Sequence, residues 1–185
     1  MGDTFNFSST QTGDGSVTQQ AHTISGDAVT TVHNDYETEQ ELGRFFYAAE
    51  VFADMPIDEG TAAAIEGQKV TALVPQAIEQ VTKDSPELLV DKAVAPDALP
   101  LNFVMSELGR QAGIPAAERD VPLIKQLLRV VHDKPSQVAK IIGRISLSFG
   151  KAWLTSMVAK NPVIAATIAA IDTAESLVSQ ETPPT

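Results

Sequence analysis

Residues 136–160 read SQVAKIIGRISLSFGKAWLTSMVAK, and this stretch decides the fold class of the chain. Its large apolar side chains recur every three or four residues, which is the period of one face of an α-helix. That stripe consists of Val138, Ile141, Ile142, Ile145, Phe149, Trp153 and Met157. The opposite side is polar and basic, with Lys140, Arg144, Ser148, Lys151 and Thr155. The stretch therefore predicts one long amphipathic helix in a mainly α protein.

The helical pattern continues toward the C-terminus. Asn161-Pro162 interrupts it, because a proline inside a helix removes a hydrogen bond and clashes with the preceding turn. An Ala- and Ile-rich helix is predicted from residue 163 to about residue 178, so residues 136–178 form a helical hairpin. Residues 180–185 contain two prolines and predict a disordered tail.

The pattern on the N-terminal side predicts further helices separated by prolines. Residues 37–53 carry one apolar stripe, made of Leu42, Phe45, Phe46, Ala49 and Phe52. Further helices are predicted over residues 61–82, with a kink or break at Pro75, from Ser85-Pro86-Glu87 onward, over residues 101–112 up to Gly113, and over residues 120–132. The sequence therefore predicts a helical bundle over residues 36–179.

Residues 1–35, the leader, have a different character. Gly2-Asp3, Gly13-Asp14 and Gly26-Asp27 each open a polar stretch with strand-like runs, since Gly and Asp favour turns. The leader has too few apolar residues to offset roughly 1–2 kcal/mol of backbone entropy per ordered residue. It is either disordered in a monomer or paired with other copies by strand addition, and we favour pairing. The predicted oligomer interface consists of Phe5, Phe7, Val17, Ile24, Val29 and Val32.

Composition excludes several classes of protein. The 185 residues contain no Cys, which rules out a disulfide scaffold, a thiolate nucleophile and a Cys-ligated metal. The net charge of −11 argues against nucleic acid as a partner, because that binding depends on neutralising phosphates. Residues 1–100 hold 17 acids and 4 bases, whereas residues 101–185 hold 7 acids and 9 bases. The first ten residues lack the basic and apolar regions of a secretory signal, so we expect a cytoplasmic protein.

The residues that could carry chemistry form no recognisable site. His22, His33 and His132 are not spaced as metal ligands on one helix face, and the acids from Asp54 to Glu66 are out of register for a calcium loop. No phosphate loop, nucleophile elbow or dinucleotide fingerprint occurs. We therefore expect no catalytic, cofactor or metal site, and a protein that is not an enzyme.

The basic amphipathic stretch is the strongest functional lead. Lys140, Arg144, Phe149, Lys151 and Trp153 predict a face that binds an anionic membrane or a partner protein. The other interpretation is a core hairpin, whose apolar stripe is buried against the phenylalanines of residues 37–53. An acidic face of another subunit is a further partner for these bases.

The first residues, Gly2-Asp3-Thr4-Phe5-Asn6-Phe7-Ser8, resemble a leader found on many small bacterial proteins, with Ser9 in place of the usual glycine. Such leaders often precede helical or conflict-system (defence-related) effector modules. The resemblance implies a bacterial, cytoplasmic, self-associating protein linked to defence, and it assigns no functional residue.

Three functions follow as expectations. The first is a non-enzymatic protein that assembles into a ring, filament or shell, with the leader making contacts between subunits of a homo-oligomer. The second is a membrane-perturbing defence effector that uses residues 136–178. The third is an adaptor that binds a larger bacterial protein.

Overall fold

The computed structural model describes residues 31–67, 73–89 and 99–180. The chain divides into two units, Met1–Tyr36 and Glu37–Thr185. The strand-like runs of the leader are residues 4–8, 17–18 and 28–32, and all of them before residue 31 lie outside the described residues. So do Phe5, Phe7, Val17, Ile24 and Val29 of the predicted interface and residues 181–185 of the predicted tail. Val32, assigned to a strand by its β-branched neighbours, falls instead in the first helix. Residues 31–36 continue the helix predicted over residues 37–53, and adding residues to an existing helix costs less than nucleating a new element.

The described residues form eight α-helices, which confirms the predicted mainly α, bundle-like fold. These are α1 (Thr31–Ala53), α2 (Glu59–Glu66), α3 (Val74–Asp84), α4 (Leu101–Ala112), α5 (Val121–Asp133), α6 (Pro135–Phe149), α7 (Lys151–Lys160) and α8 (Pro162–Gln180). Two 3₁₀ turns, η2 (Pro86–Leu88) and η3 (Ala116–Glu118), lie in the connections.

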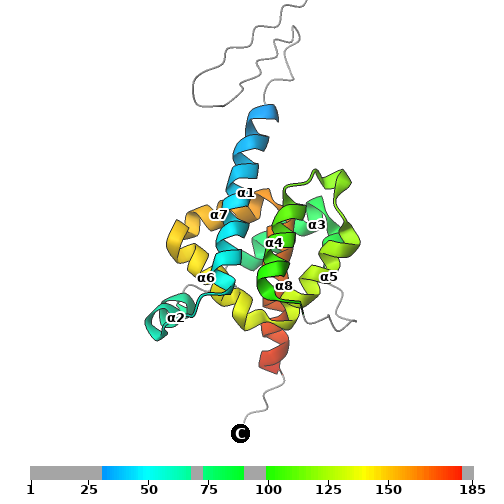
Figure 1. Cartoon of the computed structure of the whole chain (residues 1–185). Helices are drawn as coiled ribbons and strands as arrows, with labels where there is room; N and C mark the ends of the chain where they lie inside the picture. Colours follow the sequence, from blue (N-terminus) through cyan, green and yellow to red (C-terminus); the bar gives the residue numbers. More distant parts are fainter. Residues whose placement is uncertain (1–30, 68–72, 90–98, 181–185) are drawn as a thin grey trace, which may run out of the picture. The chain divides into compact units, whose positions relative to one another are not determined.

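Helix α8 is the centre of the helical domain, and α3, α4, α5, α6 and α7 all pack against it (Figure 1). Every residue from Pro162 to Ile171 is buried, so this part of the helix is covered on all sides. A helix that is apolar all round belongs in such a position. Its first turn is capped by the buried Asn161, whose Oδ1 accepts hydrogen bonds from the backbone N–H groups of Val163 (2.9 Å) and Ile164 (3.4 Å).

Helices α1 and α4 run antiparallel and in close contact. Asp54, just after α1, accepts a hydrogen bond from Asn102 near the start of α4 (3.3 Å). About two turns away, Phe46 of α1 lies against Gly109 of α4. The predicted apolar stripe of α1 faces inward as expected, since Phe45 and Ala49 have no exposed surface. The two contacts fix which residues of α1 and α4 lie at the same level.

The prediction of a single helix over residues 136–160 is wrong. The structure has two helices, α6 and α7, with Gly150 between them at φ 90° and ψ 147°. Only glycine adopts this conformation without strain, so the chain turns at this residue although the apolar pattern continues through it.

Two other expected helices are shorter than predicted. The helix expected over residues 61–82 is split into α2 and α3, with Pro75 in the first turn of α3. A proline is favourable there because the first helical N–H groups have no partner within the helix. Ser85-Pro86-Glu87 opens only the 3₁₀ turn η2, and the Ser85 side chain makes no capping hydrogen bond.

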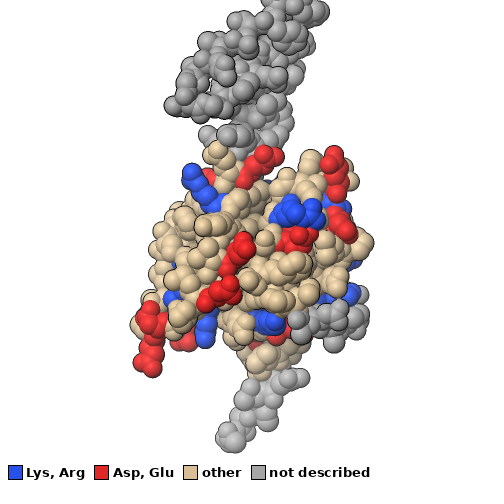
Figure 2. Space-filling model, viewed as in Figure 1, with Lys and Arg blue, Asp and Glu red and all other residues tan. Residues whose placement is uncertain are grey.

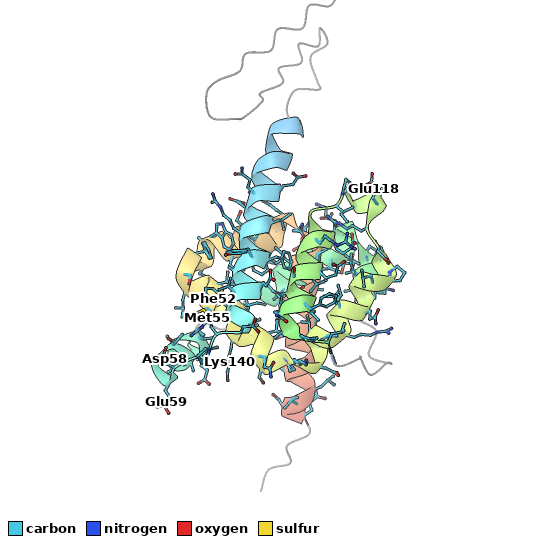
Figure 3. The ribbon with its side chains drawn as sticks, viewed as in Figure 1. Phe52, Met55, Asp58, Glu59, Glu118 and Lys140 are labelled. Atoms are coloured by element: carbon cyan, nitrogen blue, oxygen red, sulfur yellow. The ribbon has the colours of Figure 1, made fainter. Side chains whose placement is uncertain are left out.

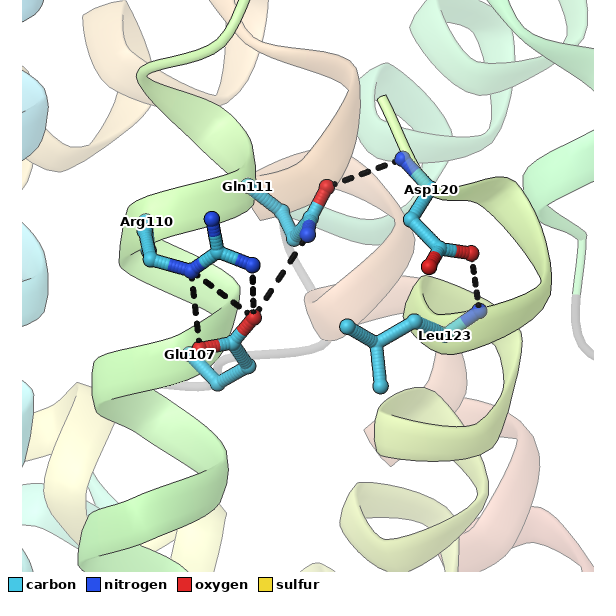
Figure 4. A network of polar contacts seen from close by, with 5 residues as sticks. All are labelled: Glu107, Arg110, Gln111, Asp120 and Leu123. Atoms are coloured by element: carbon cyan, nitrogen blue, oxygen red, sulfur yellow. Dashed lines mark hydrogen bonds and ion pairs between the residues drawn. The ribbon is translucent and has the colours of Figure 1, made fainter. Parts of the chain in front are cut away.

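The connection from α4 to α5 agrees with the sequence prediction. Helix α4 ends at Gly113, and Asp120 caps α5 by accepting a hydrogen bond from the N–H of Leu123 (3.0 Å). The buried Gln111 accepts a hydrogen bond from the N–H of Asp120 (3.0 Å), which ties the end of α4 to the start of α5 (Figure 4). The Gln111 hydrogen bond therefore holds α4 against α5.

Candidate functional site

The most prominent feature of the described surface is a set of exposed apolar side chains on α1 and α4, which we call the α1–α4 face. It consists of Tyr47 (70% exposed), Val51 (40%) and Phe103 (52%). Tyr47 and Val51 are four residues apart, so they are neighbours on one side of α1. Phe103 follows Asn102, which contacts Asp54, and therefore lies at about the level of Val51. Tyr47 and Val51 are therefore adjacent on α1, and Phe103 is exposed on the neighbouring helix α4.

Charged side chains border this face. Arg44 and Asp54 are both exposed, one before Tyr47 and the other after Val51. On α4, Arg110 pairs with Glu107 (2.6 Å), and this hydrogen-bonded pairing lowers the pKa of Glu107. Acidic and basic side chains are interspersed over α1 and α4 in Figure 2. The unequal charge of the two halves of the sequence therefore does not give this face a single sign.

The structure brings together three of the five residues predicted for a membrane or partner face. Phe149, Lys151 and Trp153 surround the turn between α6 and α7. The rings of Phe149 and Trp153 stack at 4.8 Å between centroids, and the Phe45 ring of α1 lies 6.3 Å from Trp153. Trp153 is half-buried while Phe149 remains exposed, so this aromatic cluster joins the core to the surface.

Arg144, the fourth predicted residue, is engaged within the domain. Its Nη2 donates a hydrogen bond to the carbonyl of Pro56 (2.8 Å), and its guanidinium lies 5.9 Å from the centre of the Phe52 ring. Figure 3 labels Phe52, Met55 and Asp58 around this junction between α1 and α2, together with the exposed Lys140 of α6. Arg144 therefore holds the α1–α2 connection onto α6.

The acidic segment after α1 has a structural explanation. Asp58 caps α2 by accepting hydrogen bonds from the N–H (2.8 Å) and hydroxyl (2.7 Å) of Thr61. These bonds, with a smaller contribution from the charge of Arg144, lower the pKa of Asp58. Within residues 31–67, 73–89 and 99–180, no group of three His, Cys, Asp or Glu side chains is arranged to hold a metal ion.

A groove of about 450 Å³ lies between α3 and α7. Its lining consists of Gln76, Glu79, Gln80, Ala152, Thr155, Ser156 and Ala159. The hydroxyl of Thr155 is already bonded to the carbonyl of Lys151 (2.9 Å). None of the predicted site residues lines this groove. The sequence signal for this groove is the spacing of the small residues Ala152, Thr155, Ser156 and Ala159, which lie on the side of α7 toward α3.

Helix α8 is the one helix in the described part of the chain that is long and apolar enough to cross a membrane. That statement concerns length and composition only, and 56% of the relevant window is buried within the protein. The core helix of a water-soluble bundle meets the same criterion. No protein-family model, curated protein or solved structure matches this chain.

Proposed function

We propose that this chain is a non-enzymatic self-assembling protein, with the α1–α4 face as one of its contact surfaces. The observation that carries the proposal is the exposure of Tyr47 and Val51 on α1 and of Phe103 on α4, while inward residues of the same helices, such as Phe45 and Met105, are fully covered. Single exposed apolar residues are common on proteins, whereas a contiguous group indicates an interaction site.

Covering this face has an energetic basis. Apolar surface removed from water stabilises an assembly by roughly 25 cal/mol per Å². Large aromatic side chains such as Tyr47 and Phe103 are also among the residue types enriched in protein interfaces. A second contact surface on the same chain would allow more than two copies to assemble.

The leader is the second surface in this proposal. Phe5, Phe7, Val17, Ile24, Val29 and Val32 remain the predicted contacts between subunits. A chain with two different contact surfaces can build a closed ring or an open filament, depending on the rotation between subunits. The resemblance of residues 2–8 adds a bacterial, cytoplasmic and defence-linked setting, with a larger bacterial protein as a further partner.

Light scattering coupled to size-exclusion chromatography tests the proposal on the full chain over a range of concentrations. We expect a mass above that of one chain, and a lower mass for a variant that lacks residues 1–35 but retains its helical circular dichroism. A full chain that remains a monomer throughout the range would overturn self-assembly.

A membrane-perturbing effector is the second candidate, and the apolar first half of α8, Pro162 to Ile171, favours it. In that function the surrounding helices would open and α8 would enter the bilayer, with Phe149, Lys151, Trp153 and Lys140 meeting the headgroups. Aromatic and basic side chains favour the membrane interface. Lys160, at the end of α7, and Asn161 oppose the insertion of α7 together with α8.

Trp153 is the only tryptophan, so its fluorescence reports on this region alone. The membrane function predicts a blue shift and dye release when the full chain meets vesicles that contain an anionic lipid, and a smaller effect at high salt. A Trp153 emission wavelength that does not change on addition of these vesicles, together with no dye release, would exclude the membrane function and leave self-assembly.

A further inference from the structure

We infer that the α1–α4 face binds the same face of a second copy, with the two α1 helices antiparallel about a twofold axis at the level of Ala49 along the helix. This inference rests on the proposed self-assembly and names one of its interfaces. A twofold interface uses one surface twice, so that surface has to be complementary to itself. The sequence of α1 around Ala49 meets that requirement.

The apolar residues match across such an axis. Tyr47 and Val51 lie two residues before and two after Ala49, so an antiparallel arrangement places each Tyr47 against the Val51 of the other copy. The large ring thus meets a small side chain at both equivalent positions. Phe103, which is exposed on the neighbouring helix α4, adds to the apolar surface that each copy offers.

The charged residues match as well. Arg44 and Asp54 lie five residues before and five after Ala49, so each Arg44 lies at the level of the other copy's Asp54. Both side chains are exposed, and neither belongs to the two ion pairs found in the described residues, Glu107–Arg110 and Glu41–Lys160. A parallel arrangement would place Arg44 against Arg44, and like charges there would oppose association.

The basic surface of α6 is a poorer partner for this face. Arg144 is occupied by the carbonyl of Pro56 and the ring of Phe52, which leaves Lys140 as the free cation of that pair. A contact with α6 would also leave Arg44 without an acidic partner. A second copy satisfies the apolar and the charged residues of the face together.

Sedimentation equilibrium of the full-length chain tests the inference with apolar variants. We expect Val51→Glu to weaken association at least tenfold, because each copy would bury a charge against the Tyr47 ring of the other. Ile78→Glu is the matched control, since Ile78 is 46% exposed on α3, outside the face. It is expected to leave association unchanged. Melting temperatures near that of the unmodified chain show that both variants are folded.

Charge exchange provides the sharper test. Arg44→Glu and Asp54→Arg should each weaken association several-fold, and the double variant should restore it because both contacts re-form with reversed sign. A double variant as weak as the two single changes combined overturns the arrangement. An oligomer that Val51→Glu leaves intact overturns this inference but retains self-assembly, whereas an unmodified chain that is monomeric overturns both.

Discussion

Gly109 of α4 lies so close to Phe46 of α1 that a Cβ at residue 109 would be 2.5 Å from the Phe46 Cβ. Real Cβ atoms do not approach other carbons so closely, so glycine is required for this spacing of the two helices. The Phe46 ring is buried beside this contact, at 3% exposure, and meets the Phe45 ring edge to face at 4.9 Å. This contact therefore holds together the two helices that present the α1–α4 face.

The first prediction is that Gly109→Ala lowers the free energy of unfolding. Alanine favours a helix over glycine by roughly 0.5–1 kcal/mol, which opposes the effect. The clash involves the Cβ of Phe46, which cannot rotate away, so the helices themselves have to separate. Overpacking of this kind costs about 1–3 kcal/mol, and we expect a net loss in urea unfolding followed by circular dichroism.

Gly43→Ala is the control for this prediction. Gly43 lies in the same bundle within α1, but a Cβ there has open space around it. The substitution should stabilise the chain by roughly 0.5–1 kcal/mol through helix propensity alone. Equal effects of the two alanine substitutions would contradict the role of the Phe46 contact.

Periodicity identified the helical segments, although not all of their bounds, because helices such as α1 and α5 bury one apolar face. The stripe of Phe45 and Ala49 is fully covered, and the break at Asn161-Pro162 lies where proline chemistry requires it. The turn at Gly150 was missed because the apolar pattern runs on from Phe149 to Trp153. A positive φ at a glycine follows from tertiary packing and leaves no trace in a hydrophobic pattern.

The second prediction concerns that turn. Gly150→Ala should lower the free energy of unfolding by about 1–3 kcal/mol, because an alanine at φ 90° and ψ 147° is strained. No neighbouring atom lies within 4 Å of a Cβ there, so the whole effect would come from the backbone. A variant as stable as the unmodified chain would show that the connection between α6 and α7 relaxes to another conformation.

The candidate site was harder to predict than the fold. A hydrophobic pattern identifies which side of α1 is buried, but it cannot show that Tyr47 and Val51 on the other side remain uncovered. Their exposure depends on the position of α4, and this position is set by the close contact of Phe46 with Gly109, two residues far apart in the sequence. Arg144 was assigned to a free basic face because the sequence does not reveal the Pro56 carbonyl beside it.

The third prediction separates the two cations of α6. Arg144→Gln removes the hydrogen bond to the Pro56 carbonyl and the contact with the Phe52 ring, and should lower the free energy of unfolding by about 1 kcal/mol. Lys140→Gln, at an exposed position one turn earlier, should change it by less than about 0.5 kcal/mol. Equal losses in urea unfolding would contradict the role assigned to Arg144.

The last prediction uses two carboxyl groups whose pKa values are shifted in opposite directions. Burial, with a smaller contribution from Asp172, raises the pKa of Glu175 on α8, whereas hydrogen bonds from Arg110 lower that of Glu107 on α4. A raised carboxyl pKa disfavours the folded state once pH rises above the unfolded value of about 4.3. A lowered pKa contributes stability above that value, and this stability is lost as pH falls through the folded pKa.

Glu175→Gln should therefore be more stable than the unmodified chain at pH 7, and the difference should disappear as pH falls below about 4, where Glu175 is protonated in both states. Glu107→Gln should be less stable at pH 7, and its deficit should shrink over the same acidic range. Urea unfolding of the three proteins between pH 3 and pH 7 would measure both differences. A Glu175→Gln protein that is less stable than the unmodified chain at pH 7 would contradict a raised pKa of Glu175 in the folded state.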